Sequence, residues 1–150
     1  MATWFETRVR YEKMMDNGVV KKVTEPYLVD ALSFAEAEAR TIEEIRPFMS
    51  GEFSVSAARK TRIAEIFGSE DGSADRFYLV KAGFITFDEK TGAEKRTPCL
   101  MLVHASGFDD AVRRFKGGMK GTVSDYEMIS VAETAIMDVF HGKPEPGQED

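Results

Sequence analysis

The chain has 150 residues, of which 43% are hydrophobic and 31% charged, and its formal net charge is −6. This length and composition predict one folded domain of ordinary size and exclude a disordered protein. Cys99 is the only cysteine, which excludes intrachain disulfides. No apolar run reaches the roughly 20 residues of a membrane helix, which excludes a membrane span. No signal peptide is recognisable, and we expect a cytoplasmic protein.

The first half of the chain predicts a β-hairpin and then a helix. Asn17 and Gly18 lie between two stretches rich in aromatic and β-branched residues, a strong hairpin signal because both residues tolerate positive φ. Ser33 and Glu36 form a capping box, after which apolar residues recur at helical spacing until Pro47. The predicted strands are 4–14 and 19–29, and a third extended segment covers 53–67.

The second half predicts the same elements in the same order. Residues 88–92 form the turn of a second hairpin, Ser106 and Asp109 repeat the form of the capping box, and Gly117-Gly118 ends the helix. The third segments also suit a helix face, and we predict strand because 53–56 alternates between apolar and polar residues. The strands of this half are 77–87 and 93–103, and its third segment covers 126–140.

The parallel between the halves indicates an internal duplication. One constant offset pairs Phe53 with Tyr126 and Ile63 with Ile136, and a polar segment rich in glycine and acid separates the copies. We therefore predict an α+β fold of two tandem ββαβ repeats, which form a pseudo-twofold body with helices packed on antiparallel or mixed sheet. The predicted boundaries are a single domain over 1–140 (repeat one 3–67, linker 68–75, repeat two 76–140) and a disordered acidic tail over 141–150.

The motif content favours a binding protein over an enzyme. HExxH, GxSxG and P-loop patterns are absent, and the two histidines are dispersed, so we predict no catalytic residue, no metal and no cofactor. A phosphodiesterase-like enzyme is the third alternative, and it would need His104 in a cleft with a carboxylate and a nucleophile.

Basic residues on the first strand and in the third segment form the first candidate site. Arg8 and Arg10 alternate with Val9 and Tyr11 and share one face, and the basic stretch 59–62 has no basic residue in its counterpart, 132–135, of the second copy. If these strands are neighbours, one cationic patch results; the alternative is a solvated edge strand protected from aggregation. The candidate ligand-binding residues here are Arg8, Arg10, Tyr11, Arg59, Lys60 and Arg62, with Tyr11 as a stacking surface.

A glycine-rich segment that contains Lys116 and Lys120 is a second candidate. Successive glycines allow backbone N–H groups to converge on an anion, and the lysines supply positive charge. The alternative is a glycine helix end with cations that complement the helix dipole.

Residues 21–34 and 132–139 resemble a family of small proteins of unknown function from Bacteroidales and their phages. The resemblance covers the chain from Trp4 to about Phe140 and carries no catalytic motif. It implies a phage or mobile-element accessory protein that acts in a bacterial cytoplasm. We expect a homo-oligomer that binds and sequesters a small phosphate-bearing ligand, a nucleotide signal of antiphage defence. The alternative is an interaction module for nucleic acid or a host protein, although the net charge disfavours nucleic acid.

Overall fold

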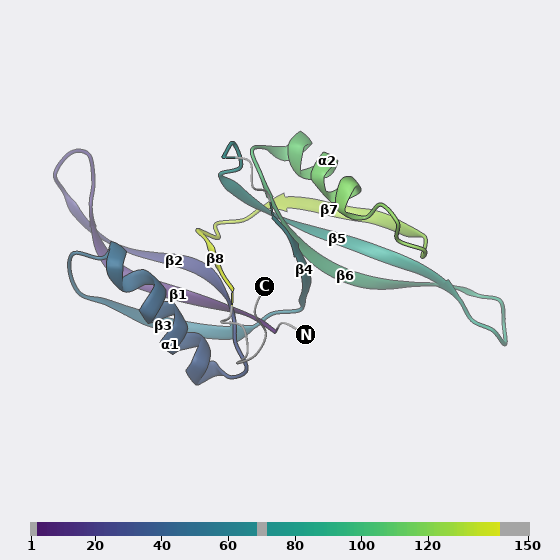
Figure 1. Ribbon diagram of the computed structural model, residues 1–150, viewed down its shortest axis with the longest axis horizontal. Coiled ribbons are helices and arrows are strands. Elements are labelled where there is room, and N and C mark those ends of the chain that lie inside the picture. Colours follow the sequence, from purple (N-terminus) through teal and green to yellow (C-terminus); the bar gives the residue numbers. More distant parts are fainter. Residues whose placement is uncertain (1–2, 69–71, 142–150) are drawn as a thin grey trace, which may run out of the picture. The chain divides into compact units, whose positions relative to one another are not determined.

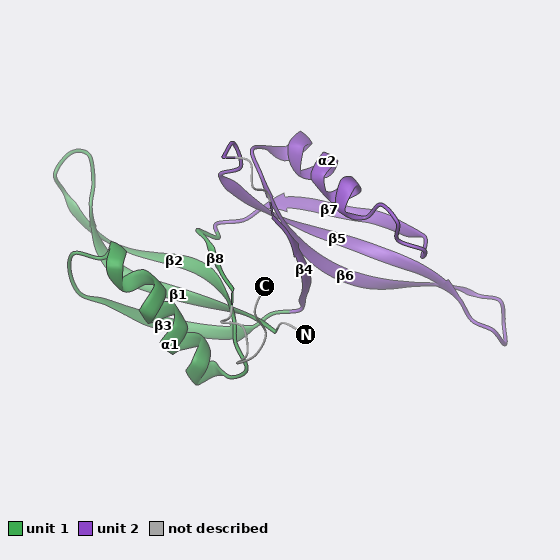
Figure 2. Ribbon diagram, in the orientation of Figure 1, with its two compact units in different colours: residues 1–61, 136–150 green, residues 62–135 purple. Residues whose placement is uncertain are grey.

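The computed structural model describes residues 3–68 and 72–141 of the chain. The chain divides into two compact units, residues 1–61 with 136–150 (unit 1) and residues 62–135 (unit 2), which Figure 2 colours separately. Over the described residues each unit contains one mixed four-stranded sheet and one α-helix, so the α+β class is confirmed.

Unit 1 contains a sheet in the order β3-β1-β2-β8 (Figure 1). β1 pairs antiparallel with both β2 and β3, and β8 pairs parallel with the end of β2. Its elements are β1 (Trp4–Met14), β2 (Val20–Asp30), α1 (Phe34–Ile45), the 3-10 helix η1 (Arg46–Phe48), β3 (Phe53–Lys60) and β8 (Val139–Phe140).

Unit 2 contains a sheet in the order β4-β6-β5-β7. β5 pairs antiparallel with β6 and β7, and β4 pairs parallel with β6. Its elements are β4 (Ile63–Phe67), β5 (Arg76–Phe87), β6 (Glu94–Ala105), α2 (Phe108–Gly118) and β7 (Tyr126–Glu133).

The two predicted third segments are each divided into two strands. After β3 the backbone N–H and the hydroxyl of Thr61 both donate to the carbonyl of Trp4, and Thr134 makes the same two bonds to the carbonyl of Phe77 after β7. These bonds end each antiparallel ladder, and the chain then continues into a strand of the other sheet: β4 pairs with β6, and β8 with β2.

The units therefore do not begin and end where the predicted repeats do. The unit boundaries lie at 61/62 and 135/136, whereas the predicted linker is 68–75. Residues 69–71 of that linker and residues 142–150 of the predicted tail lie outside the described residues.

The start of α2 corrects the predicted capping box by one residue. Gly107 is the N-cap and supplies no side-chain bond. Asp110, not Asp109, accepts from the backbone N–H and the hydroxyl of Ser106, both at 3.0 Å. The pKa of Asp110 is held well below its usual range by the backbone bond from Ser106, and Arg114 and Arg113 add to this effect. In α1 the predicted cap is confirmed, because Ser33 accepts from the N–H of Glu36.

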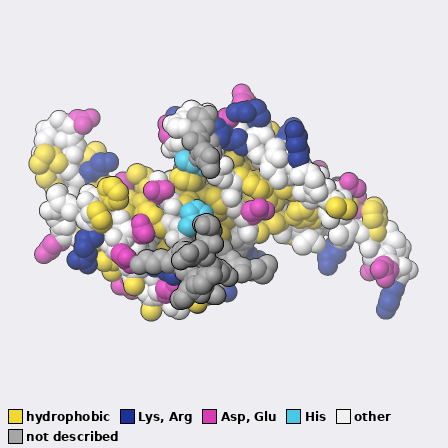
Figure 3. All heavy atoms as spheres, viewed as in Figure 1, with side chains coloured by type: hydrophobic (Ala, Val, Ile, Leu, Met, Phe, Trp, Pro, Cys, Tyr) yellow, Lys and Arg dark blue, Asp and Glu magenta, His cyan; other side chains and the backbone are white. Residues whose placement is uncertain are grey.

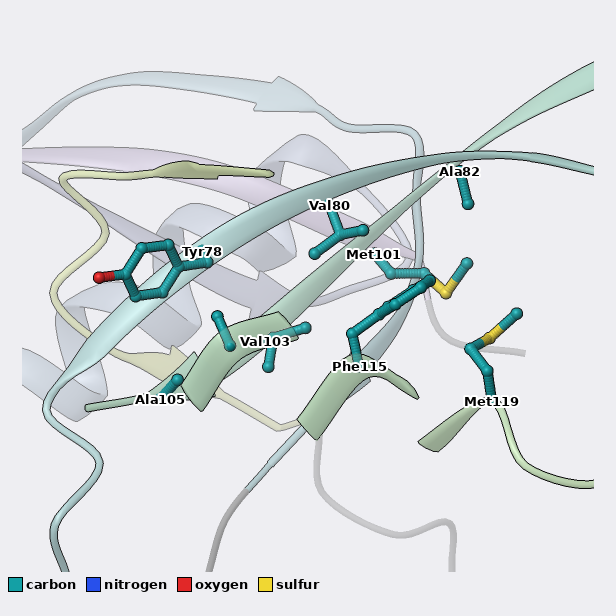
Figure 4. Close-up of a cluster of buried hydrophobic side chains, with 9 residues drawn as sticks. Tyr78, Val80, Ala82, Met101, Val103, Ala105, Phe115 and Met119 are labelled. Carbon is teal, nitrogen blue, oxygen red and sulfur yellow. The ribbon is translucent and has the colours of Figure 1, made fainter. Parts of the chain in front are cut away.

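Each helix covers one face of its own sheet. In unit 1, Ile45 of α1 packs in a cluster with Val9 and Tyr27. In unit 2, Phe115 of α2 and Met119 just after it point toward the strands that carry Val80, Met101 and Val103 (Figure 4). Because strand residues alternate between faces, the even-numbered residues of β1 lie on the opposite face, which we call the distal face of unit 1.

Candidate functional site

A groove of about 810 Å³ lies at the hairpin end of unit 1. Its walls are the last residues of β1, the start of β2 and the segment that connects η1 to β3. The groove exists because β1 is longer than its neighbour: β3 begins at Phe53, opposite Tyr11, and β1 continues to Met14 without a β3 partner. The hairpin thus extends beyond the four-stranded part of the sheet.

Aromatic and aliphatic side chains form the apolar part of the groove. Tyr11, Phe48 and Phe53 supply the aromatic rings, and Met14 and Val20 supply the aliphatic surface. Phe48 is 82% exposed and Met14 is 72% exposed, which is high for such large apolar side chains. Hydrophobic and basic side chains lie together at the hairpin end of unit 1, on the left of the view in Figure 3.

Three basic residues give the groove its positive charge, against two acidic ones. Arg10, Lys13 and Lys22 line it, together with Glu12 and Glu52. Arg10 and Lys22 are diagonal neighbours on the distal face, since Arg10 is paired with Thr24 and Glu12 with Lys22. The ion pairs found among the described side chains include none of the three basic residues.

Tyr11 is the predicted stacking residue, and its hydroxyl is engaged inside unit 1. The hydroxyl donates to the carboxylate of Glu25 at 2.7 Å. Burial, together with the hydrogen bond to Glu25 and its negative charge, raises the pKa of Tyr11 to about 12. The phenol therefore stays protonated at neutral pH, and only its ring contributes to the wall of the groove.

Arg8 and Arg59 lie outside the groove, around the carboxylate of Glu6. The register places Arg59 of β3 opposite Glu6 of β1, so the condition for a shared cationic patch is met: the two strands are neighbours. Arg59 donates to the two carboxylate oxygens of Glu6 at 3.3 and 3.2 Å, and Arg8 lies 3.5 Å from the same group. The hydrogen bond from Arg59 to Glu6 raises the pKa of Arg59.

Lys60 and Arg62 are not brought onto the distal face with Arg59. Lys60 is paired with Phe5, whose side chain is in the core under α1, so Lys60 lies on the helix side of the sheet. Arg62 lies between β3 and β4 and is exposed. Adjacent residues of β3 lie on opposite faces of the sheet, so basic residues that are contiguous in the sequence do not form one patch.

Lys116 and Lys120 belong to unit 2 and do not flank an anion-binding nest. Gly117 and Gly118 are the last two residues of α2, which ends there as predicted, and their backbone is helical rather than a nest. Gly118 has a packing role, because a Cβ there would lie 2.9 Å from ring atoms of Phe67. Both lysines are exposed, Lys116 in the last turn of α2 and Lys120 just beyond it.

The histidine required by the enzyme alternative packs against an aromatic ring. His104 is partly buried and stacks on Phe77 with ring centroids 4.3 Å apart and planes 6° apart. Over residues 3–68 and 72–141, no group of three or more His, Cys, Asp or Glu side chains is arranged to hold a metal ion.

Sequence reasoning missed Lys13, Lys22 and Phe48 as candidate site residues. The two lysines lie on either side of the Asn17-Gly18 turn, so the hairpin pairing alone brings them to the same end of the sheet. Phe48 follows Pro47 at the end of the helical segment, a position that marks a chain reversal but does not show which side chains then meet.

None of the described helices has the length and hydrophobicity that crossing a membrane requires. No curated protein and no solved structure matches the chain. A family model matches residues 3–142, which include both sheets, both helices and the groove. The chain therefore belongs to the DUF4494 family, described as a domain of unknown function.

Proposed function

We propose that the protein is a non-enzymatic binding protein that captures a small phosphate-bearing ligand, a nucleotide, in the groove of unit 1. One observation carries the proposal: a concave site of about 810 Å³ is lined both by Arg10, Lys13 and Lys22 and by the aromatic residues Tyr11, Phe48 and Phe53. Ligand sites typically measure about 300–1,000 Å³.

The chemistry of the groove suits the two parts of a nucleotide. Lysine and arginine side chains bind phosphate through charge-assisted hydrogen bonds. An exposed aromatic ring such as Phe48 offers a face on which a base stacks, and stacking is worth about 1–3 kcal/mol per base. The groove also has an apolar rim at Met14 and Val20, which shields a bound ligand from water.

The biological role that we propose is sequestration of a nucleotide immune signal. In this role the protein is a phage or mobile-element accessory protein that acts as a homo-oligomer in a bacterial cytoplasm. Capture without turnover needs a binding groove and no catalytic group, and this combination is what the groove and the packing of His104 support.

We also propose that residues 1–140 form a single domain of two tandem ββαβ repeats. Two correspondences support this proposal. A β-bulge interrupts the β1–β3 ladder between Arg8 and Val9 and the β5–β7 ladder between Lys81 and Ala82, which is the same place in each ladder. Phe140 of β8 is paired with Val29 in one sheet, and Phe67 of β4 with Val103 in the other.

The test is a binding screen with two variants of adjacent lysines in β2, which lie on opposite faces of the sheet. The purified chain is screened by thermal shift against mononucleotides, cyclic dinucleotides and NAD. A ligand at 100 times its dissociation constant adds about 2.7 kcal/mol to folding, a shift of several degrees. Lys22→Ala removes a lysine of the groove and should abolish the shift. Lys21→Ala removes the adjacent lysine, which does not line the groove, and should leave the shift unchanged.

The ligand should be recovered intact from the complex, since capture does not consume it. A ligand that is converted during incubation contradicts the non-enzymatic part of the proposal. Equal effects of Lys21→Ala and Lys22→Ala contradict the groove as the site.

A host-protein partner is the second candidate, favoured by one observation. Phe48 and Met14 are exposed by 82% and 72% beside the open edge of β1, as in surfaces that bind another protein. Absence of any nucleotide-dependent shift, together with loss of a copurifying partner in Phe48→Ala, would favour this candidate.

A further inference from the structure

We propose that the ligand of the groove carries two phosphates, as in a phosphodiester-linked dinucleotide, and that the second phosphate binds between Arg8 and Arg59 on the distal face. This inference rests on the proposed function and names the ligand class of the same site. It follows from the way the positive charge of the groove continues along β1.

The cations form a line that begins in the groove. Arg10 lines the groove, and Arg8 lies two residues earlier on the same face of β1. Two residues of a strand span about 6.5–7 Å, so Arg8 and Arg10 are successive residues on the same face of β1. Arg59 of β3 is paired with Glu6, the next residue on this face of β1 after Arg8 in the direction of the N-terminus. A ligand whose first phosphate lies at Arg10 therefore reaches Arg8 and Arg59 by extending along the strand.

Glu6 orients the second part of this site without neutralising it. Its carboxylate, with a side chain only 12% exposed, binds Arg59 through two bonds and lies 3.5 Å from the Nε of Arg8. The arginine side chains themselves remain 67% and 56% exposed. A guanidinium group has five N–H donors, so each arginine keeps donors for a phosphate. Fixing the two groups in advance lowers the entropy cost of binding.

The corresponding face of unit 2 lacks this line of charge. The two bulges align Arg8 with Lys81, and the residues that match Arg10 and Arg59 are then Gly83 and Ala132. Gly83 is covered by the side chain of Ile129, whose Cδ1 would lie 3.1 Å from a Cβ at that position. The two-phosphate site is thus a property of unit 1 alone.

The experiment compares AMP with 5′-phosphorylated diadenylate and with a 5′-phosphorylated hexa-adenylate by isothermal titration calorimetry on the full chain. The second phosphate should make diadenylate bind about tenfold more tightly than AMP, the gain expected from one or two added charge-assisted hydrogen bonds. Arg8→Ala with Arg59→Ala should abolish this gain and leave the affinity for AMP unchanged. Lys60→Ala, next to Arg59 but on the other side of the sheet, is the matched control and should change neither affinity.

Arg8→Ala alone leaves the Arg59–Glu6 pair intact and serves if the double variant does not fold. Equal affinities for AMP and diadenylate would overturn the inference while leaving the proposed function standing. A hexa-adenylate that binds more than tenfold tighter than diadenylate would also overturn it, since the surface would then be a track for single-stranded nucleic acid. If no adenylate of any length binds, this inference and the adenine-nucleotide form of the proposed function fail together.

Discussion

On the α1 side of its sheet, unit 1 contains one fully buried and one partly buried polar pair at positions where unit 2 is apolar. Thr7 and Thr41, both fully buried, lie 2.8 Å apart through their hydroxyl oxygens, and Tyr11 donates to Glu25. In unit 2 the matching positions pair Val80 with Phe115 and Phe84 with Cys99. These matches follow from the two bulges and from the equivalent starts of the helices at Phe34 and Phe108.

This difference shows that one arrangement of strands and helix accepts two kinds of core. A buried hydrogen bond contributes only about 0.5–1.5 kcal/mol net, whereas an unpaired buried hydroxyl costs about 1–3 kcal/mol. The threonine pair of unit 1 therefore adds little to the free energy of unfolding. It favours the packing in which the two hydroxyl groups meet, because any other packing leaves a buried hydroxyl unpaired. Unit 2 gains its stability from burial of large rings, chiefly Phe115.

The largest effect should come from Phe115→Ala, which removes the buried ring at the centre of unit 2. Deletion of a buried phenylalanine costs about 3–5 kcal/mol, so the free energy of unfolding should fall by that amount in chemical denaturation. Phe108→Ala, on the same helix but 54% exposed, is the control and should change stability far less. Similar losses from the two variants would show that the core of unit 2 does not depend on this ring.

Thr41→Val should have the second largest effect. The Thr41 hydroxyl donates to the carbonyl of Ala37 at 2.8 Å, so Thr7 must donate to Thr41. The variant leaves the Thr7 proton buried without an acceptor, at a cost of about 1–3 kcal/mol. Thr7→Val should cost less, since Thr41 keeps its bond to Ala37. The double variant should be more stable than Thr41→Val alone, and the double-mutant cycle measures this coupling. A strictly additive cycle would mean that the pair does not act as a unit.

Substitutions of Gly118 and Gly117 should have opposite signs. Gly118→Ala places a Cβ against the ring of Phe67 and should destabilise unit 2 by about 1–2 kcal/mol through overpacking. Gly117→Ala meets nothing within 4 Å and should stabilise α2 by up to about 1 kcal/mol. In unit 1 the ring that corresponds to Phe67 is Phe140, and it stacks on Tyr27. Two variants of equal stability would show that the contact between Phe67 and α2 is not tight.

The smallest effect is a change of stability at alkaline pH. Tyr11 has a pKa of about 12 in the folded chain, compared with 10.0 ordinarily. A raised phenol pKa means that the neutral form is favoured by folding. The stability from the Tyr11–Glu25 pair is therefore complete below pH 10 and is lost as the pH rises toward 12. In an ultraviolet titration Tyr11→Phe should remove the last tyrosine transition, and its unfolding free energy should depend less on pH above 10. An unchanged last transition would assign it to another tyrosine.

The hairpins and the start of α1 could be predicted because their signals are local, and the cap of α2 was placed within one residue. Asn17 and Gly18 form the first turn, where Gly18 has φ of +83°, and Ser33 caps α1. The destination of β4 and β8 could not be predicted, because an apolar run does not indicate which sheet it joins. The same limit applies to the groove: alternation along β1 placed Arg8 and Arg10 together, but the meeting of Phe48 with Lys22 depends on where η1 returns to the sheet.

The exchange of β4 and β8 also has a consequence for synthesis of the chain. Unit 2 is one continuous stretch, 62–135, so every strand of its sheet is synthesised before β8. Unit 1 must wait for Val139 and Phe140, because β8 is its fourth strand. During translation β2 therefore has an unpaired edge at Leu28 and Val29 until β8 has been made. A released chain shortened to residues 1–135 should contain every strand of the second sheet and lack the fourth strand of the first.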